Sequence, residues 1–340
     1  MISDRNKGEK NMKAAILSKY GKLPVYQDFP DPVVHKADET LIYPTASAIK
    51  QLDISKAAGT HYTKFDKLPS VVGTDGVGIT DAGDRIYTMG ITGMMAEKAI
   101  IKKKGGIIIP KGLDDGVAAA IPNTLVGSDL ALMVKGGIKS GDCVFINGAT
   151  GGTGAMAVQM AKIRGAKTVI VTGRDSKKLE YLKEIGADVT IDLKQDNDKL
   201  IKAIIESYKE SPFDIILDYL WGQPAEAIMT SLLKVRLGSS ITYISVGSLA
   251  NNTANIPSQL LRSKEIQIVG SGIGSFPASV LQKYLQENLK MVYDLVNKED
   301  IKFKTASFNL ERTFIQETLN KLAERPKTDP QLDLFSYDTG

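Results

Sequence analysis

The chain has 340 residues, of which 43% are hydrophobic and 24% charged, a composition typical of globular enzymes with two domains. Its net charge of +4, from 43 basic and 39 acidic residues, is too small and too evenly spread to predict nucleic-acid binding. The single cysteine excludes a disulfide framework, which is consistent with a reducing cytoplasm. One cysteine and two histidines also exclude the usual zinc sites. No run of 18 apolar residues occurs, so we expect no transmembrane helix.

The first third of the chain is predicted to be β-rich. Residues 1–11 lack the apolar core of a signal peptide and are interpreted as a disordered leader or a tag. Short strands separated by glycine turns are expected from residue 12 to about 115, with one helix over 46–58. A helix that starts at Asp114 is expected to break at Pro122, and a second helix is expected over 128–135.

A glycine-rich turn, Asn147-Gly-Ala-Thr-Gly-Gly-Thr-Gly154, is the stretch on which the functional prediction depends. It follows the apolar run Cys143–Ile146, which suits a buried strand, and precedes a helical pattern that ends near Gly165. Glycines let the backbone approach a ligand, and the first helical N–H groups have no partner within the helix. The turn therefore predicts an anion site of the dinucleotide-binding kind; the alternative is a tight turn without ligand.

Strands and helices alternate from this turn onward. Strands are predicted over 143–146, 167–172, 189–191, 213–218, 241–246 and 266–269. Six strands with helical crossovers predict an α/β fold with a doubly wound parallel sheet, covered by helices on both faces. A long amphipathic helix is expected over 280–296, and a further helix near 311–324.

The residues after the second of these strands favour NADPH over NADH. An NAD-specific site usually has an acidic residue there, which binds the ribose 2′-hydroxyl. Here Gly173 is followed by basic and hydroxyl side chains that suit a 2′-phosphate, namely Arg174, Ser176, Lys177 and Lys178. Asp175 is the exception, and we expect it to point outward or to cap the next helix. The alternative is a solvated helix N-terminus with ordinary surface cations.

Four segments together resemble a known family: AAAIP, GDCVFINGATGGTGAMAVQMAK, GADVTIDL and LRSKEIQIVGSGIGS. They are similar to the zinc-free medium-chain dehydrogenase/reductases, especially the NADPH:quinone oxidoreductase group, from about Met12 to the C-terminus. The resemblance implies a GroES-like catalytic domain (12–123 and 276–340) and a Rossmann nucleotide-binding domain (124–275), with the active site in the cleft between them. It also implies a homodimer.

The resemblance assigns further cofactor residues at the ends of the predicted strands. The pyrophosphate would lie over Thr150, Gly151, Gly152 and Thr153. The nicotinamide end would be held by two segments after the fifth and sixth strands, Val246-Gly247-Ser248 and Ser271-Gly272-Ile273. For each of these glycine pairs, the alternative is a plain turn at the end of a strand.

The metal ligands of the zinc-dependent relatives are missing. Lys50 stands where the first catalytic cysteine would be, and Thr74 replaces the histidine of a Gly-His-Glu-like motif. Asn123 lies near the third ligand position, and the four-cysteine structural lobe is absent. We therefore predict no metal and disfavour zinc-assisted alcohol oxidation.

Four polar side chains are candidates for the substrate end of the site. Tyr62 resembles a tyrosine that lines the cleft in quinone oxidoreductases and would bond a carbonyl or donate a proton; otherwise it packs on the surface. Lys50 would approach substrate or ribose, or be solvated or ion-paired. Asn123 would bind cofactor or substrate, or cap the helix near Ser128. His61 would be a proton donor or a surface residue. Tyr62 and Lys50 are the predicted catalytic residues.

The predicted function is zinc-independent, NADPH-dependent hydride transfer to a quinone or an α,β-unsaturated carbonyl. Such acceptors delocalise the incoming charge, so orientation and one hydrogen-bond donor can suffice. The alternative is an NADPH-binding sensor or structural protein without turnover. The partner is expected to be a small-molecule substrate, without nucleic acid or membrane.

Overall fold

The computed structural model describes residues 11–61 and 63–303. The chain divides into two compact units, whose described parts are 11–122 with 285–303 (unit 1) and 123–284 (unit 2). Tyr62, most of the predicted leader and the helix expected near 311–324 lie outside the described residues. The predicted domain boundaries, at 123 and 276, stay a prediction.

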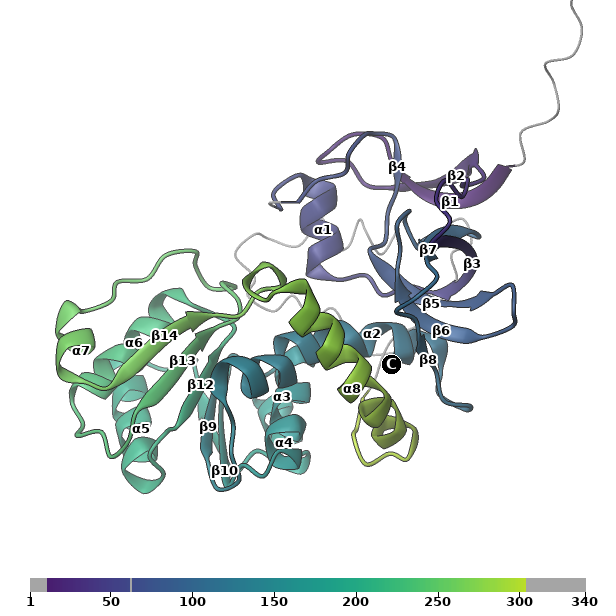
Figure 1. Cartoon of the computed structure of the whole chain (residues 1–340). Helices are drawn as coiled ribbons and strands as arrows, with labels where there is room; N and C mark the ends of the chain where they lie inside the picture. The colour runs from purple at the N-terminus through teal and green to yellow at the C-terminus, as the bar shows by residue number, and fades with distance from the viewer. Residues whose placement is uncertain (1–10, 62, 304–340) are drawn as a thin grey trace, which may run out of the picture. The chain divides into compact units, whose positions relative to one another are not determined.

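Unit 1 contains two antiparallel sheets and a short helix (Figure 1), and it includes part of two longer helices described below. The first sheet has the strand order β2-β1-β4 and the second β7-β3-β5-β6-β8. The elements are β1 (Asn11–Leu17), β2 (Val25–Pro30), β3 (Glu39–Ala46), α1 (Gln51–Ala58), β4 (Ser70–Val71), β5 (Asp75–Thr80), β6 (Arg85–Met89), β7 (Ala99–Lys102) and β8 (Ile107–Ile108). The β-rich character predicted for this part of the chain is confirmed.

Helix α2 (Asp115–Gly127) continues through Pro122, so the predicted break at that proline is wrong. Proline cannot donate the amide hydrogen bond that Ala118, four residues earlier, would otherwise accept. The hydroxyl of Tyr293, on helix α8 (Ala278–Asn297), donates to the Ala118 carbonyl oxygen at 2.8 Å instead. A residue from the far end of the sequence thus satisfies the carbonyl that the proline leaves free.

Unit 2 contains a six-stranded parallel sheet with the order β11-β10-β9-β12-β13-β14. The strands are β9 (Cys143–Asn147), β10 (Thr168–Gly173), β11 (Val189–Asp192), β12 (Ile215–Asp218), β13 (Ile241–Ser245) and β14 (Ile266–Gly270). The connecting helices are α3 (Gly152–Ile163), α4 (Ser176–Glu184), α5 (Asn197–Glu210), α6 (Gly222–Leu233) and α7 (Ser258–Ser263). Strand order reverses between β9 and β12, which is the switch point of a doubly wound sheet.

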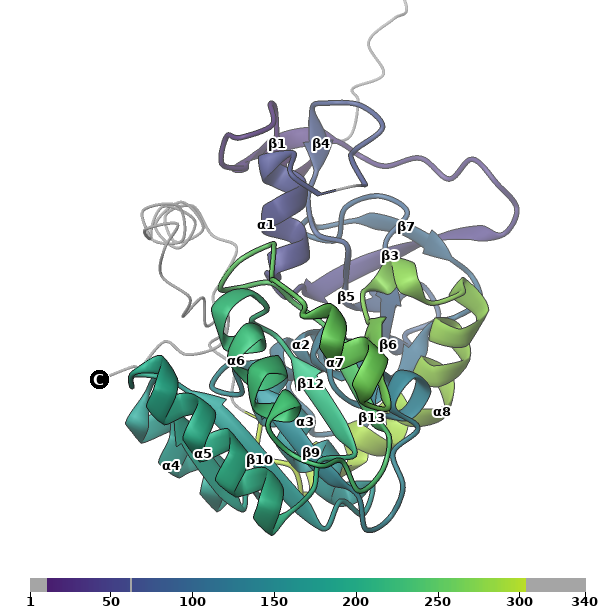
Figure 2. The same cartoon turned by 90° about the vertical axis from the view of Figure 1, so that its left-hand side faces the viewer.

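Two hydrophobic cores lie on opposite faces of this sheet, between its strands and the helices beside it (Figure 2). Val144 and Ile146 of β9 pack into the core beneath α3 and α4, while Phe145 between them packs into the core beneath α5 and α6. Because both faces are covered, the central strands β9 and β12 are buried along their whole length instead of alternating. The predicted fold class, a Rossmann sheet together with a GroES-like β-rich part, is confirmed.

The helix predicted over 128–135 is a π-helix, Ala131–Gly136. Together with α2 it forms a stretch, Asp115–Gly136, that is long and apolar enough by composition to cross a membrane. That stretch is 72% buried inside the structure, as the core helix of a globular protein would be.

Candidate functional site

The glycine turn joins β9 to α3 and is shaped by two close approaches. Gly148 has a φ of +83°, and a Cβ there would lie 2.6 Å from the Leu220 side chain. A Cβ at Gly154 would lie 2.4 Å from the Ala149 carbonyl oxygen. No side chain caps the N-terminus of α3, where Gly151 is the N-cap residue. The turn therefore presents uncapped helical N–H groups next to a backbone that only glycine permits.

The predicted 2′-phosphate residues lie beside this turn. A Cβ at Gly173, the last residue of β10, would lie 2.3 Å from the Thr150 methyl group, so the two segments are in contact. Arg174, Ser176 and Lys177 follow and are exposed, and Lys178 is half-buried. Asp175 is the N-cap of α4, where its carboxylate accepts the Lys178 amide at 3.1 Å. Of the two roles expected for Asp175, the structure shows the helix cap.

The two segments predicted to hold the nicotinamide follow β13 and β14 at the same sheet edge, because all six strands are parallel. The Ser271 amide donates to the Ser245 carbonyl at 2.8 Å, which joins the two strand ends. A Cβ at Gly247 would lie 2.7 Å from the Tyr219 carbonyl oxygen. The Ser271 hydroxyl is buried and has no hydrogen-bond partner among the residues described. An unpaired buried hydroxyl is unusual in proteins, which makes Ser271 a candidate for contact with a ligand.

The C-terminal end of α2 completes this arrangement. A Cβ at Gly127 would lie 2.8 Å from the Thr153 methyl group and 3.8 Å from Val246. Asn123 is four residues earlier and so lies on the same face of the helix. It sits inside α2, so the expected alternative that it caps the helix near Ser128 is wrong.

Sequence reasoning missed a group of buried polar residues at the same sheet edge. Asn147 and Asp218 end β9 and β12, Thr172 is one residue from the end of β10, and Tyr243 lies on β13. All four are at most 1% exposed and are hydrogen-bonded to one another. Burial raises the pKa of Asp218 above its ordinary value, against the opposing effect of the donors around it. The sequence feature that could have revealed this group is a polar residue at the end of an otherwise apolar predicted strand.

Unit 1 holds a second buried polar cluster, centred on Lys50. The ammonium bonds the Ala48 carbonyl at 3.0 Å and the carboxylates of Asp75 and Asp53, the latter at 3.2 Å. Lys50 is 1% exposed, so its three donors are directed to protein groups. The expectation of an ion-paired lysine is confirmed, while contact with substrate or ribose stays a prediction.

The remaining candidate ligands and proton donors are dispersed. His61 bonds the Thr63 hydroxyl within its own loop, at 2.7 Å. Burial raises the pKa of the Cys143 thiol to about 12, so this thiol stays protonated at neutral pH. In residues 11–61 and 63–303, no group of three or more His, Cys, Asp or Glu side chains is arranged to hold a metal ion.

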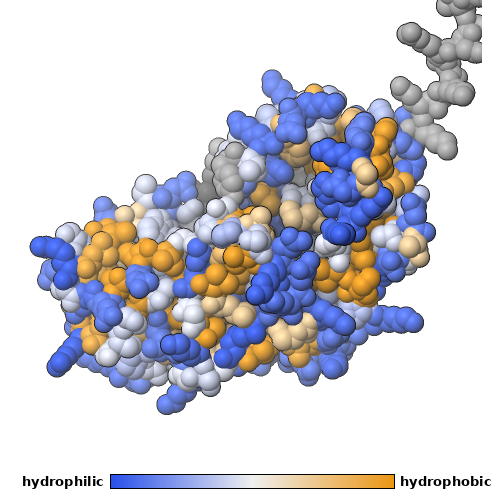
Figure 3. Space-filling model, viewed as in Figure 1, coloured by the Kyte–Doolittle hydropathy of each residue, from blue (hydrophilic) through white to orange (hydrophobic). Residues whose placement is uncertain are grey.

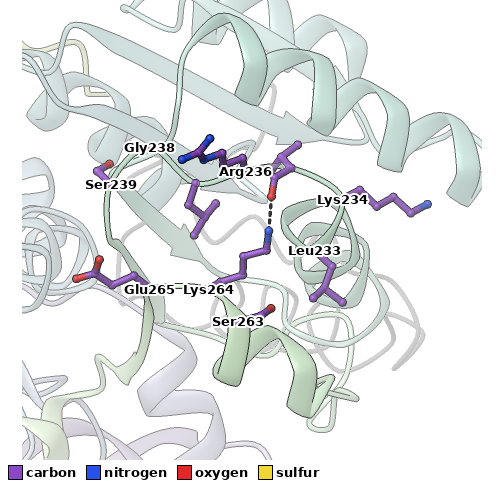
Figure 4. A pocket seen from close by; sticks show the side chains of 10 residues that line it. Leu233, Lys234, Arg236, Gly238, Ser239, Ser263, Lys264 and Glu265 are labelled. Carbon is purple, nitrogen blue, oxygen red and sulfur yellow. Dashed lines mark hydrogen bonds between the residues drawn. The ribbon is translucent and has the colours of Figure 1, made fainter.

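A pocket of ≈ 370 Å³ lies at the opposite, amino-terminal edge of the sheet. It is lined by 233–239 and 263–265, which precede β13 and β14. Figure 4 shows that its cations do not converge: Lys264 bonds the Val235 carbonyl and Lys234 points away. We therefore place the candidate site at the carboxyl edge, where the glycine turn and the unpaired Ser271 hydroxyl lie.

Comparison with known proteins connects this arrangement to a family. A family model described as zinc-binding dehydrogenase matches residues 152–292, a segment without cysteine or histidine. The quinone oxidoreductase of Sus scrofa is 30% identical over 227 residues, which are 63% of this chain and 68% of that protein. The chloroplastic NADPH-dependent alkenal/one oxidoreductase of Arabidopsis thaliana is 29% identical over 210 residues, 55% of this chain. This chain spans 54% of the Arabidopsis protein.

A different and much shorter similarity involves the protein RepR of Streptococcus agalactiae. It is 95% identical over 40 residues, which are 12% of this chain and 8% of that protein. A match of this length is confined to one segment and says nothing of the remaining chain.

Solved structures support the fold over nearly the whole chain. A mycobacterial quinone oxidoreductase matches with a TM-score of 0.78 and 20% identity, covering 92% of this chain and 96% of that one. The quinone oxidoreductase of Thermus thermophilus, whose structure has also been solved in complex with NADPH, matches with a TM-score of 0.68 and 21% identity. The match covers 81% of this chain and 85% of that one. With this fold and the identity to the Sus scrofa protein, the chain belongs to the medium-chain dehydrogenase/reductase family, in its NADPH:quinone oxidoreductase-like group.

Proposed function

We propose that this protein is an NADPH-dependent oxidoreductase that transfers hydride, without zinc, to a quinone or an α,β-unsaturated carbonyl. The observation that carries the proposal is the carboxyl edge of the unit 2 sheet, along which lie the glycine turn, a basic segment and an unpaired buried hydroxyl. The names of the Sus scrofa and Arabidopsis relatives support the reaction type.

The residues at this edge fit a dinucleotide. Any side chain at Gly154 or Gly173 would collide with the turn, and the uncapped start of α3 supplies N–H donors for a pyrophosphate. The Ser271 hydroxyl, buried and without a partner in the described chain, is available to a polar group of the nicotinamide end. Thr150, Gly151, Gly152 and Thr153 would hold the pyrophosphate.

The choice of NADPH rests on the segment that follows β10. The one acidic side chain in it, Asp175, is occupied as the cap of α4, so it does not compete for the ribose hydroxyl. Arg174 is exposed and forms no ion pair with any described residue, which leaves its guanidinium available for a phosphate. Ser176 and Lys177 lie in the first turn of α4, where the helix dipole also favours an anion.

These residues are proposed to orient the cofactor and the acceptor, without forming a covalent bond to either. NADPH, when bound, would supply the hydride, which a conjugated acceptor would take at carbon while its oxygen takes the developing charge. The protein holds the cofactor through the turn and the strand ends, and offers one donor to that oxygen. We propose Tyr62, outside the described residues, as this donor. An alcohol substrate would need its hydroxyl pKa lowered, and Lys50, Thr74 and Asn123 do not provide a zinc site for that.

The purified chain is expected to oxidise NADPH in the presence of a quinone or an enone, with a rate that a metal chelator does not change. Simple alcohols with NADP⁺ should give no measurable hydride transfer. Absorbance at the NADPH band, followed over a panel of quinones, enals, enones and alcohols, provides the measurement. Chelator-sensitive alcohol oxidation would contradict the zinc-free reaction. NADPH binding without turnover on any acceptor would favour a sensor or structural protein.

The same assay tests the proposed donor. Tyr62→Phe should lower turnover of enones by roughly 10²–10⁴-fold, the range for loss of one general acid, and of quinones by less. Equal rates for the variant and the wild type would remove Tyr62 from the mechanism.

We also propose that the chain forms a homodimer through the edge of the unit 2 sheet. Among the described strands, β14 pairs only with β13, so its outer edge is open to another strand. Figure 3 shows hydrophobic side chains gathered over the end of unit 2 that carries β14 and α7, where Leu261 is 52% exposed. Light scattering should give the mass of two chains, and a monomer at all concentrations would refute this.

A further inference from the structure

We propose that Asn147 and Thr172 are positioning residues for the glycine turn. Anchored on Asp218, they carry a chain of side-chain hydrogen bonds across the sheet to the amide of Gly148, and so hold the turn in the shape that receives the pyrophosphate. This inference rests on the proposed function, because it concerns the same cofactor.

The chain of hydrogen bonds crosses four adjacent strands. The Tyr243 hydroxyl donates to Asp218 Oδ2 at 2.6 Å, and Asn147 Nδ2 donates to Asp218 Oδ1 at 2.8 Å. The Thr172 hydroxyl donates to Asn147 Oδ1 at 2.7 Å, and the Gly148 amide donates to Thr172 Oγ1 at 2.9 Å. The step from Asp218 to Asn147 spans β12 and β9, the pair at which the strand order reverses.

The direction of every bond in this chain is determined by Asp218. Its Oδ1 also accepts the amides of Leu220 at 2.8 Å and Trp221 at 3.1 Å, so the neighbouring Asn147 group must be the donor –NH₂. The other side of that amide is then an oxygen, which takes the single proton of Thr172. A lone pair of Thr172 Oγ1 accepts the Gly148 amide.

Thr172 secures the turn at two successive residues. Its hydroxyl accepts the Gly148 amide, and its backbone carbonyl accepts the Ala149 amide at 2.9 Å. Gly148 is the residue in the left-handed region, with φ +83°, where the chain leaves β9 for the turn. Without the hydroxyl, the Gly148 amide would lose its partner at the position that sets the direction of the following residues. Misplacement of the turn would then weaken contacts to the pyrophosphate that residues 150–153 make.

The test compares the binding of NADPH with that of adenosine 2′-monophosphate. Both ligands carry the 2′-phosphate, but only NADPH has a pyrophosphate. Thr172→Val, which keeps the shape and removes the hydroxyl, should raise the Kd for NADPH about tenfold. The Kd for adenosine 2′-monophosphate, which has no pyrophosphate, should stay unchanged. Thr172→Ser restores the hydroxyl and should restore NADPH binding. Asn147→Leu, two bonds from the turn, should weaken NADPH binding in the same selective way.

The outcomes separate this inference from the proposed function. A wild-type chain that binds neither ligand refutes the proposed function and the inference with it. A wild-type chain that binds NADPH, with Thr172→Val binding equally well, refutes only the inference. An equal loss of both ligands in Thr172→Val also overturns it, because it indicates general damage to unit 2 instead of a positioned turn. An unaffected Asn147→Leu variant would remove Asn147 from the chain of contacts.

Discussion

Replacing Lys50 with methionine is expected to lower the free energy of unfolding by about 3–5 kcal/mol, the range for removal of one partner from a buried ion pair. The side chain is 1% exposed and balances two carboxylates, Asp53 and Asp75. Methionine fills a similar volume but has no charge. Two buried carboxylates would then remain without a cation, and they can become neutral only by taking up protons.

The surroundings of Lys50 explain why this loss should be large. Asp53 Oδ1 accepts the amide and hydroxyl of Thr74, at 3.1 and 2.9 Å. Asp75 Oδ2 accepts the Tyr87 hydroxyl at 2.7 Å. Each carboxylate is therefore held beside the ammonium by a second set of contacts and cannot turn toward water.

The pH dependence of this contribution has a definite sign. Burial lowers the pKa of Lys50, but the charges of Asp75 and Asp53 and the hydrogen bonds to them together outweigh burial, and the net pKa is raised above its ordinary value. A raised lysine pKa gives stability that is fully present below the unfolded value, about 10.4, and is lost only as pH rises through the folded value. The difference between wild type and Lys50→Met should therefore not be reduced by titration of Lys50 between pH 6 and 9.

Urea unfolding followed by circular dichroism measures this effect, and Lys102→Met is the matched control. Lys102 forms an ion pair with Asp38 at 2.6 Å, but both side chains are at least half exposed, at 50% and 63%. Its removal should leave the unfolding transition unchanged within error. A Lys50→Met variant as stable as the wild type would show that the buried cluster does not need its cation.

Replacing Arg174 with alanine is expected to raise the Michaelis constant for NADPH by roughly tenfold or more, the equivalent of one charge-assisted hydrogen bond. The Michaelis constant for NADH should barely change, because NADH has no 2′-phosphate. The position supports this selectivity: Arg174 directly follows Gly173, which contacts Thr150 of the glycine turn. Its guanidinium is exposed and lies next to the N-terminus of α4.

Steady-state kinetics with both cofactors, against one quinone, measure this preference. Arg236→Ala is a suitable control, because Arg236 is also exposed but lines the pocket at the opposite edge of the sheet. It should change neither constant. Equal losses for NADPH and NADH in Arg174→Ala would contradict the assignment of the 2′-phosphate site.

Arg174 and Lys50, the residues of these two predictions, could be recognised from the sequence to different degrees. Arg174 was recognisable because it follows a predicted strand, and its neighbourhood depends on the strand–turn–helix order alone. Lys50 was noticed only through what it replaces in related proteins. Its partner Asp75 is 25 residues away, and no local pattern shows that the two meet.

The sequence by itself determined the parallel sheet, the glycine turn and the order of the segments proposed to bind the cofactor. Strand and helix periodicity, together with glycines at Gly148 and Gly154, are local properties of the backbone, so they can be read without knowing the fold. The scarcity of histidine and cysteine likewise follows from a count.

The tertiary structure decided which distant polar groups satisfy each other. Helix α2 passes through Pro122 because Tyr293, 175 residues beyond Ala118, takes the free carbonyl. Asn147 meets Asp218, 71 residues later, because β9 and β12 are neighbours at the switch point. A buried donor or acceptor must find a partner wherever the topology brings one. For the distant pairs named here, strand order and topology determine that partner.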